Sequence, residues 1–176
     1  MSSDHIQWIA IDWGTSNLGG WTMSDSGRIL DQANSEQGMA TVNATDEDFE
    51  SALLDLIQPW LKAGGSIPVI ACGMVGARQG WLEVPYDEAP CSPHTSLTKV
   101  PTRDPRIDVS IFAGVCQESP ADVMRGEETQ IAGLLSRSPD FGGLICLPGT
   151  HTKWVSVGGK KIYQQNSTNY QLRRMI

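Results

Sequence analysis

The sequence lacks the features that mark nucleic-acid-binding, metal-binding and secreted disulfide-rich proteins. It has 13 Lys and Arg against 20 Asp and Glu, a formal net charge of −7, so its average surface repels nucleic acid and anionic membranes. The four cysteines form no C-x-x-C pair and lie near no histidine at metal-ligand spacing, which predicts reduced thiols. No signal-peptide pattern or bilayer-length apolar run is present. We therefore expect a soluble, cytoplasmic protein that binds neither nucleic acid nor membrane.

Two common phosphate-binding motifs are also missing. The chain has no G-x-x-x-x-G-K-[ST] and no G-x-G-x-x-G between a strand and a helix, so neither a P-loop nor a dinucleotide fold is indicated. Any anionic ligand must instead meet a local cluster of hydrogen-bond donors.

The apolar pattern predicts a mixed α/β fold in the order βββ, α, β, loop, β, α, β. With 176 residues, 40% of them hydrophobic, the chain can form one compact domain with a core. Gly27 is expected to take a positive φ in a tight hairpin. No internal repeat is apparent. Strands are expected at residues 6–13, 17–24, 28–31, 67–72, 107–115, 143–147 and 154–157.

Two helices and one long loop complete this pattern. The first helix is expected to begin at Thr45 or Asp46 and to kink or end near Ile57, because Pro59 removes a backbone hydrogen bond. The second covers residues 126–136. Residues 73–105 are rich in Gly and Pro, and so long a loop is usually functional.

Two strand-turn-strand segments carry clustered donors. In residues 11–17, IDWGTSN, a strand presents Asp12, and Gly14 permits a tight turn into hydroxyl, amide and backbone N–H groups. A phosphate loop with a nearby metal-binding carboxylate needs this set of groups, although a plain hairpin turn explains it equally well. Residues 147–155, LPGTHTKWV, repeat the formula after a second strand. We expect the two turns to face each other across one phosphate chain.

The motifs IAIDWGTSNLGGW, GMVGARQGW, DVMRGEETQIAG and LPGTHTKWV occur in this order. Together they resemble the 2-dehydro-3-deoxygalactonokinase family of the sugar kinase, actin and heat-shock ATPase superfamily. The resemblance covers residues 6 to about 162 and implies a ribonuclease H-like lobe with a hairpin start and flanking helices. It also implies ATP-dependent, Mg²⁺-assisted phosphorylation of 2-dehydro-3-deoxy-D-galactonate to its 6-phosphate in galactonate catabolism.

The resemblance assigns roles to the residues of both turns. Asp12 would hold Mg²⁺ through water and take part in catalysis. The second turn has Leu147 and Pro148 where the Asp-x-Gly-Thr form usual in the superfamily would place a carboxylate. His151 or Lys153 would supply donors instead, with a capped histidine and a solvated lysine as the alternatives. The expected nucleotide-binding residues are Gly14, Thr15, Ser16, Asn17, Gly149, Thr150, His151 and Lys153.

The two remaining motifs would bind the sugar acid and supply the base. Arg78 suits the substrate carboxylate, with Gln79 and Arg125 as further candidates, while an exposed surface arginine is the alternative. Glu127 and Glu128 are the candidate bases, with Asp122 behind them, although acidic residues also favour the start of a helix.

From residue 164 onward the sequence, QQNSTNYQLRRMI, no longer resembles the family, and a second lobe is expected to be absent. We therefore expect a family lobe at residues 1–163, an unmatched tail at 164–176, and weak or absent kinase activity. Without a second lobe, the apolar surface that this lobe normally covers would be exposed. Such a patch favours self-association, so a homodimer is expected. The alternative function is a catalytically inactive domain that binds a sugar acid or another anion.

Overall fold

A computed structural model of the chain describes residues 5–45, 48–93, 96–149 and 152–168. The chain divides into two compact units. Unit 1 comprises Met1–Pro85 and Ser96–Ala113, and unit 2 comprises Tyr86–Thr95 and Gly114–Ile176. The boundaries between these compact regions lie near residues 85, 95 and 113. The expected family lobe at residues 1–163 with an unmatched tail stays a prediction.

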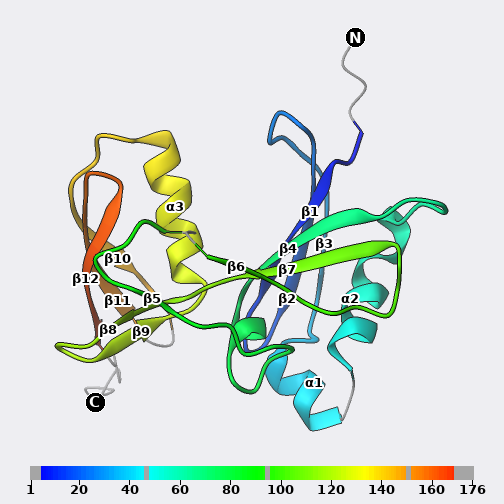
Figure 1. The fold of residues 1–176 in the computed structure, drawn as a ribbon, viewed down its shortest axis with the longest axis horizontal. Coiled ribbons are helices and arrows are strands. Elements are labelled where there is room, and N and C mark those ends of the chain that lie inside the picture. Colours follow the sequence, from blue (N-terminus) through cyan, green and yellow to red (C-terminus); the bar gives the residue numbers. More distant parts are fainter. Residues whose placement is uncertain (1–4, 46–47, 94–95, 150–151, 169–176) are drawn as a thin grey trace, which may run out of the picture. The chain divides into compact units, whose positions relative to one another are not determined.

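Unit 1 is built on a mixed six-stranded sheet in the order β3-β2-β1-β4-β7-β6 (Figure 1). β1, β4 and β7 run parallel, and the remaining strands pair antiparallel with their neighbours. Gly27 turns the chain between β2 and β3 with a φ of +76°, which confirms its expected role. The strands are β1 (Trp8–Trp13), β2 (Leu18–Met23), β3 (Ile29–Ser35), β4 (Ile67–Gly73), β6 (Leu97–Lys99) and β7 (Ile107–Phe112).

Two short helices connect β3 to β4. α2 (Phe49–Ile57) begins after Asp48, whose carboxylate accepts a hydrogen bond from the Glu50 N–H, and it ends at Ile57 as Pro59 predicted. The start expected at Thr45 is wrong, because Thr45 is the last residue of a separate helix, α1 (Met39–Thr45), and its hydroxyl donates to the Thr41 carbonyl. Asp46, the alternative start, lies outside the described residues. A 3-10 turn, η1 (Gln58–Trp60), follows α2.

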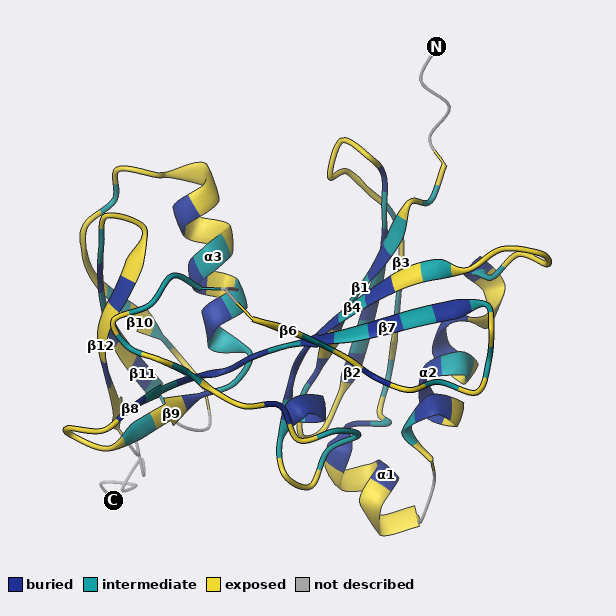
Figure 2. Cartoon of the chain, viewed as in Figure 1, coloured by how far each residue is buried: buried dark blue, intermediate teal, exposed yellow. Residues whose placement is uncertain are grey.

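The core of unit 1 lies between the sheet and α2. A Cβ placed on Gly20 of β2 would lie 3.2 Å from atoms of Ile11, Leu56 and Trp60, so the helix packs closely onto the hairpin. Figure 2 shows the buried positions alternating along these strands. The side chains at the centre of this core include Ile9, Ile11, Trp13, Leu53, Ile57, Val69 and Ile111.

The long loop expected after β4 contains ordered pieces of both units. It begins with the 3-10 turn η2 (Met74–Gly76) and includes β5 (Asp87–Glu88) and β6. The single strand expected at residues 107–115 is two strands, β7 in unit 1 and β8 (Val115–Gln117) in unit 2. The break between β7 and β8 lies at Ala113 and Gly114. The Ala113 N–H donates to the Ser96 carbonyl, whereas the Gly114 carbonyl accepts from the Asp87 N–H.

Unit 2 contains two three-stranded sheets, β5-β8-β9 and β10-β11-β12, together with α3 (Glu127–Arg137). β10 has the bounds expected from the sequence, Gly143–Leu147, and pairs antiparallel with β11 (Thr152–Gly158). β9 covers Asp122–Met124, and β12 covers Lys161–Thr168. The core of this unit is formed by Val115, Met124, Ile131, Leu135, Val155, Val157 and Ile162.

The beginning of the expected unmatched tail is part of this sheet. β12 continues through Thr168, and Gln165 is fully buried. Its side-chain amide donates to the Val115 carbonyl, and its backbone N–H donates to the side chain of Gln117. The polar residues 164–168 are therefore held by specific hydrogen bonds, while residues 169–176 lie outside the described part of the chain.

Candidate functional site

The first Gly-Thr turn lies at the carboxyl end of β1. Residues 14–17 connect β1 to β2, and the Gly14 N–H donates to the Asn17 carbonyl at 2.9 Å. Thr15, Ser16 and Asn17 are exposed. The turn thus presents hydroxyl, amide and backbone groups to solvent at the edge of a parallel sheet, where ligands of α/β proteins usually bind.

The start of α1 holds this turn in shape. The N–H groups of Met39 and Ala40 donate to the carbonyls of Gly14 and Thr15 at 3.0 and 2.9 Å. A Cβ at Gly38 would lie 2.3 Å from the carbonyl carbon of Ser16 and 2.4 Å from the Thr15 oxygen. Only glycine therefore allows the backbone of α1 to approach the turn so closely.

Asp12 lies beside Gly73 at the carboxyl ends of two adjacent parallel strands. Trp13 of β1 is paired with Gly73 of β4, which has a φ of +93°. A Cβ at Gly73 would lie 2.6 Å from the Trp13 carbonyl oxygen and 3.3 Å from Oδ1 of Asp12. Glycine is therefore required at this position, because the Trp13 carbonyl already lies where a side chain would begin, beside the exposed Asp12 carboxylate.

This arrangement fits a Mg²⁺ ion held mainly by water and phosphate oxygens. Mg²⁺ keeps several waters and is usually bound by one or two carboxylates together with substrate phosphates. Within the described ranges, no group of three or more His, Cys, Asp or Glu side chains could form a complete protein site. Asp12, which is exposed at the carboxyl end of β1, is the carboxylate of the first turn that suits such an ion.

Arg78 and Gln79 lie on the loop that leaves the same edge of the sheet. The loop follows β4 and η2, and both side chains are exposed. The side-chain amide of Asn43 in α1 donates to the Gln79 carbonyl at 2.9 Å. Because α1 also supports the first turn, one short helix connects the candidate phosphate loop to the candidate substrate loop.

In the second turn, the structure describes the ends but not the centre. Gly149 is exposed after β10, whereas Thr150 and His151, two of the expected donors, lie outside the described residues. This turn belongs to unit 2 and the first turn to unit 1. The expected pairing of the two turns across one phosphate chain therefore stays a prediction.

Lys153 is neither a surface donor nor the solvated lysine considered as its alternative. It is 5% exposed, and its ammonium lies 2.6 Å from Oδ1 of Asp122. The same ammonium contacts the Val123 carbonyl and the Ser167 hydroxyl. It faces the buried side of β11 because strand residues alternate between faces, and Lys153 shares its face with Val155.

Asp122 is held in its charged form by this contact. Burial raises its pKa, but the hydrogen bonds from Lys153 and Ser167 outweigh it, so that the pKa of Asp122 is lowered overall. Because its carboxylate binds a buried ammonium, Asp122 is a poor candidate for the catalytic base. The sequence predicts this role for Asp122 only behind Glu127 and Glu128.

The two candidate bases at the start of α3 differ in burial. Glu128 is 0% exposed, and both of its carboxyl oxygens lie 2.8 Å from the Gly126 N–H. Burial raises the pKa of Glu128 to about 7. Glu127 is partly exposed, and its Oε2 accepts from the Arg125 N–H at 3.0 Å. Glu127 is therefore the more accessible carboxylate.

The side chain of Arg125 lies against an aromatic ring. Its guanidinium carbon is 4.1 Å from the centre of the Tyr86 ring, and its Nε donates to the Tyr86 hydroxyl at 3.4 Å. Such stacking holds the guanidinium plane in one orientation. The structure thus places Arg125, Glu127 and Glu128 together at the start of α3 in unit 2, and Asp12, Arg78 and Gln79 in unit 1.

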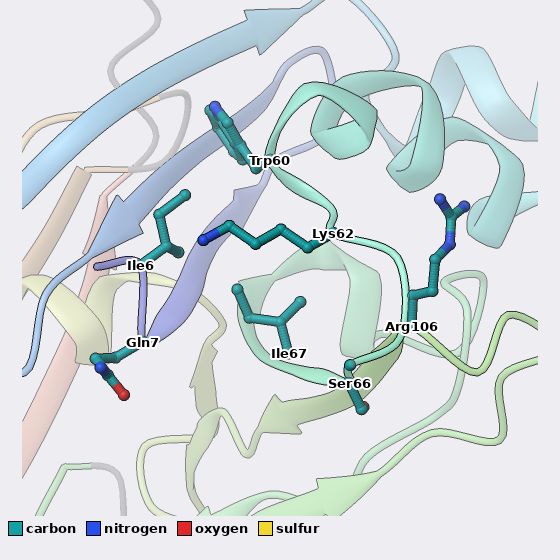
Figure 3. A pocket seen from close by; sticks show the side chains of 8 residues that line it. Ile6, Gln7, Trp60, Lys62, Ser66, Ile67 and Arg106 are labelled. Carbon is teal, nitrogen blue, oxygen red and sulfur yellow. The ribbon is translucent and has the colours of Figure 1, made fainter.

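A separate cavity of about 250 Å³ lies at the opposite end of the unit 1 sheet (Figure 3). Its lining includes residues just before β1 and β7 and at the start of β4, so it is at the amino ends of the parallel strands. Figure 3 shows the Lys62 side chain between Trp60 and Ile67, whereas Arg106 points away. Arg106 binds Asp104 at 2.7 Å. This cavity is not part of the Asp12 edge.

Sequence reasoning missed Gly38, Gly73 and the partner of Lys153. Gly73 had a visible indication, since it is the glycine that ends a buried apolar strand, much as Gly14 follows one in the first turn. No sequence pattern marks Gly38, because its role comes from the close approach of the start of α1 to the first turn, which is distant in sequence. No helix in the described portion is long and apolar enough to cross a membrane.

A sequence profile of the family described as 2-keto-3-deoxy-galactonokinase matches residues 12–169. A Rhizobium meliloti (strain 1021) protein described as probable 2-dehydro-3-deoxygalactonokinase DgoK1 is 37% identical over 162 residues, which is 88% of this chain and 51% of that protein. The 2-dehydro-3-deoxygalactonokinase of Escherichia coli (strain K12) is 33% identical over 161 residues, covering 89% of this chain and 51% of its own length.

One solved structure agrees closely with this fold. A crystal structure of a Sinorhizobium meliloti protein described by the same enzyme name superposes with a TM-score of 0.81 at 35% identity, covering 92% of this chain and 53% of that one. The chain therefore spans about half the length of the curated relatives it matches. The mixed α/β fold with a hairpin start is confirmed. The chain belongs to the 2-keto-3-deoxy-galactonokinase family.

Proposed function

We propose that the chain supplies the phosphate- and sugar-acid-binding part of a 2-dehydro-3-deoxygalactonokinase. The reaction would transfer the γ-phosphoryl group of ATP to the 6-hydroxyl of 2-dehydro-3-deoxy-D-galactonate in the cytoplasm, as a step of galactonate catabolism. The observation that carries this proposal is the edge formed by Asp12, Gly73 and residues 14–17 in a chain of this family.

Phosphoryl transfer depends mainly on position and electrostatic stabilisation, which this edge is suited to provide. Backbone N–H groups of residues 15–17 and the hydroxyls of Thr15 and Ser16 would bind phosphate oxygens. Gly149, Thr150 and His151 are the further candidates for phosphate binding. Asp12 would hold Mg²⁺ through water. The ion, when bound, neutralises charge on the phosphates.

The substrate carboxylate would bind to arginine. Arg78 and Gln79 are exposed beside the Asp12 edge, and Arg125 has a guanidinium already oriented by Tyr86. Lys153 would act by fixing Asp122 and the β11 strand rather than by touching phosphate.

Glu127 is our candidate for the base that accepts the proton of the 6-hydroxyl. Glu128 is buried, and its pKa, which burial raises to about 7, leaves part of it protonated at neutral pH. A base needs access to the substrate within hydrogen-bond reach, which Glu127 offers. Glu128 would then stabilise the start of α3.

Calorimetric titration of the 176-residue chain tests this proposal. Binding of both Mg²⁺-ATP and 2-dehydro-3-deoxygalactonate supports a kinase part, and Asp12→Asn should weaken only the former. Arg78→Ala should weaken only sugar-acid binding, with Arg137→Ala, an exposed arginine at the end of α3, as the matched control. Binding of neither ligand would overturn the proposal.

A second candidate is an inactive sugar-acid-binding or anion-binding domain. It is favoured by the fact that the chain spans about half the length of its relatives, because water exclusion and orientation of two substrates need a closed site. Sugar-acid binding without Mg²⁺-ATP binding would support it. We expect turnover by these 176 residues to be weak or absent, and turnover equal to that of the Escherichia coli relative would contradict this expectation.

A further inference from the structure

The cavity of about 250 Å³ at the amino ends of the unit 1 strands has no role in the function proposed above. Every residue that lines it belongs to unit 1. Its lining contains two basic side chains, Lys62 and Arg106, and no acidic one. In a chain with a formal net charge of −7, a cavity lined in this way favours a negatively charged occupant.

Lys62 supplies the positive charge of this cavity. Arg106 is already neutralised, because its Nη2 lies 2.7 Å from Oδ2 of Asp104. Within the described ranges, by contrast, no ion pair involves Lys62. Figure 3 shows the Lys62 side chain lying across the cavity, with its ammonium directed toward Ile6. Since Lys62 is exposed, its charge is available to a ligand that enters from solvent.

Trp60 forms a fixed apolar wall of the cavity. Its side chain is 8% exposed, and its Nε1 donates to Oδ2 of Asp31 at 2.9 Å. A Cβ on Gly20 would lie 3.2 Å from Cζ3 of the same ring, so the ring also packs against β2. Because the indole N–H is already bonded, the ring offers only carbon atoms to a ligand. Ile6 and Ile67, both partly buried, add further apolar surface.

Backbone hydrogen bonds hold the segments that surround the cavity. The Gln7 N–H, just before β1, donates to the Met23 carbonyl at 2.8 Å. The Ile67 N–H, at the start of β4, donates to the Arg106 carbonyl at 2.9 Å. The cavity is therefore formed before any ligand arrives, which reduces the cost of ordering it on binding.

The volume of the cavity limits the size of its occupant. A closed apolar cavity of about 150 Å³ is enough to hold benzene. Drug-sized ligands occupy pockets of roughly 300–1,000 Å³. A cavity of about 250 Å³ lies between these limits, so it has room for one aromatic ring or short branched chain together with a carboxylate.

We propose that this cavity binds a small organic carboxylate. Its apolar body, an aromatic ring or a branched chain, lies against Trp60, Ile6 and Ile67, and its carboxylate binds the Lys62 ammonium. The backbone N–H groups of Gln7 and Ile67 are engaged in the sheet. Most oxygens of a phosphate would therefore face apolar walls without donors, which favours the carboxylate.

Phenylacetate is the probe, because it joins one aromatic ring to one carboxylate, and phenylacetamide is its neutral counterpart of similar shape. Titration of the 176-residue chain is followed by nuclear magnetic resonance, through the backbone amides of Ser66 and Ile67 and the indole N–H of Trp60. We expect phenylacetate to shift these signals saturably. Phenylacetamide should bind at least about tenfold more weakly, because it cannot form a charge-assisted hydrogen bond with Lys62.

Two lysine variants test the source of this preference. Lys62→Met keeps an unbranched apolar side chain and should bind phenylacetate and phenylacetamide with equal affinity. Lys99→Met is the matched control, since Lys99 is also exposed in unit 1 but pairs with Asp108 at 2.9 Å. It removes the same charge from the same unit and should keep the preference for phenylacetate. Lys62→Arg should keep it as well.

Four results would overturn the proposal. These are no saturable shift of the cavity signals, equal binding of phenylacetate and phenylacetamide by the unmodified chain, an unchanged preference in Lys62→Met, or inorganic phosphate that binds at these signals as tightly as phenylacetate. None of them depends on Mg²⁺-ATP or sugar-acid binding. A failure here would therefore leave the proposed function untouched.

Discussion

Replacing Glu128 by glutamine should remove a pH dependence from the stability of unit 2. The carboxyl group is fully buried at the start of α3, where its oxygens accept from the Gly126 N–H. Burial raises the pKa of Glu128 from 4.5 to about 7, and the hydrogen bonds from the backbone only partly oppose this. Glutamine keeps an acceptor oxygen at this site but cannot ionise.

The direction and size of this pH dependence follow from the pKa values of Glu128 in the unfolded and folded states. Because the folded-state pKa is raised, the contribution of Glu128 to stability is fully present below about pH 4.5 and is lost as the pH rises through about 7. At about 1.4 kcal/mol for each pKa unit, the loss amounts to roughly 3 kcal/mol. Relative to the unmodified chain, Glu128→Gln should gain roughly this amount of unfolding free energy between acidic and mildly alkaline pH.

Urea titration read by hydrogen exchange measures the free energy of unfolding of unit 2 alone, because the exchange is followed in peptides from α3 and β11. Glu127→Gln is the matched control, because it removes the neighbouring, partly exposed carboxylate and should keep most of the pH dependence. A stability difference between Glu128→Gln and the unmodified chain that is flat from about pH 4.5 to about pH 8 would refute the reasoning. It would show that Glu128 stays ionised and would restore it as a candidate base.

Three further predictions concern other contacts. Gly38→Ala should weaken Mg²⁺-ATP binding at least about tenfold in calorimetry, because its Cβ would collide with the backbone of the first turn; Gly133→Ala, in open space on α3, should leave binding unchanged. Lys153→Met should destabilise unit 2 by about 3–5 kcal/mol in the same urea assay, since it leaves a buried carboxylate unpaired. At about pH 8, iodoacetamide should label exposed Cys146 well before Cys91, since burial raises the pKa of the Cys91 thiol to about 11; equal rates by mass spectrometry would contradict this.

Features that depend on neighbouring residues were predictable from the sequence. The hairpin at Gly27, the end of α2 at Ile57 and the bounds of β10 all follow from glycine, proline or a short apolar run. The first turn was identified in the same way, because Gly14 directly follows a buried strand. For such elements, local conformational preference and tertiary packing agree.

Features that depend on distant partners were not predictable. β12 has a polar sequence, and Gln165 can be buried because Oε1 of Gln117 and the Val115 carbonyl accept hydrogen bonds from its backbone N–H and its side-chain amide. The sequence alone suggests a surface or phosphate-binding role for Lys153, because no residue near it in the sequence indicates its contact with Asp122. Periodicity treats a buried polar residue as exposed, so these positions needed the structure.

The sequence of β10 is apolar in a way that is typical of a covered strand, and the structure shows where this expectation is met. Residues 144–147, LICL, are apolar without alternation, a pattern typical of strands covered on both faces, and β4 shows it at residues 69–72, VIAC. In unit 1 that expectation is met, since Val69, Ala71 and Cys72 are buried. In unit 2 it is met on one face only, where Ile145 and Leu147 pack against the core while Leu144 is exposed. An exposed run of this kind on an edge strand invites aggregation unless it is covered. The residues of β10 are therefore those typical of an interior strand, although within the described residues β10 lies at the edge of its sheet.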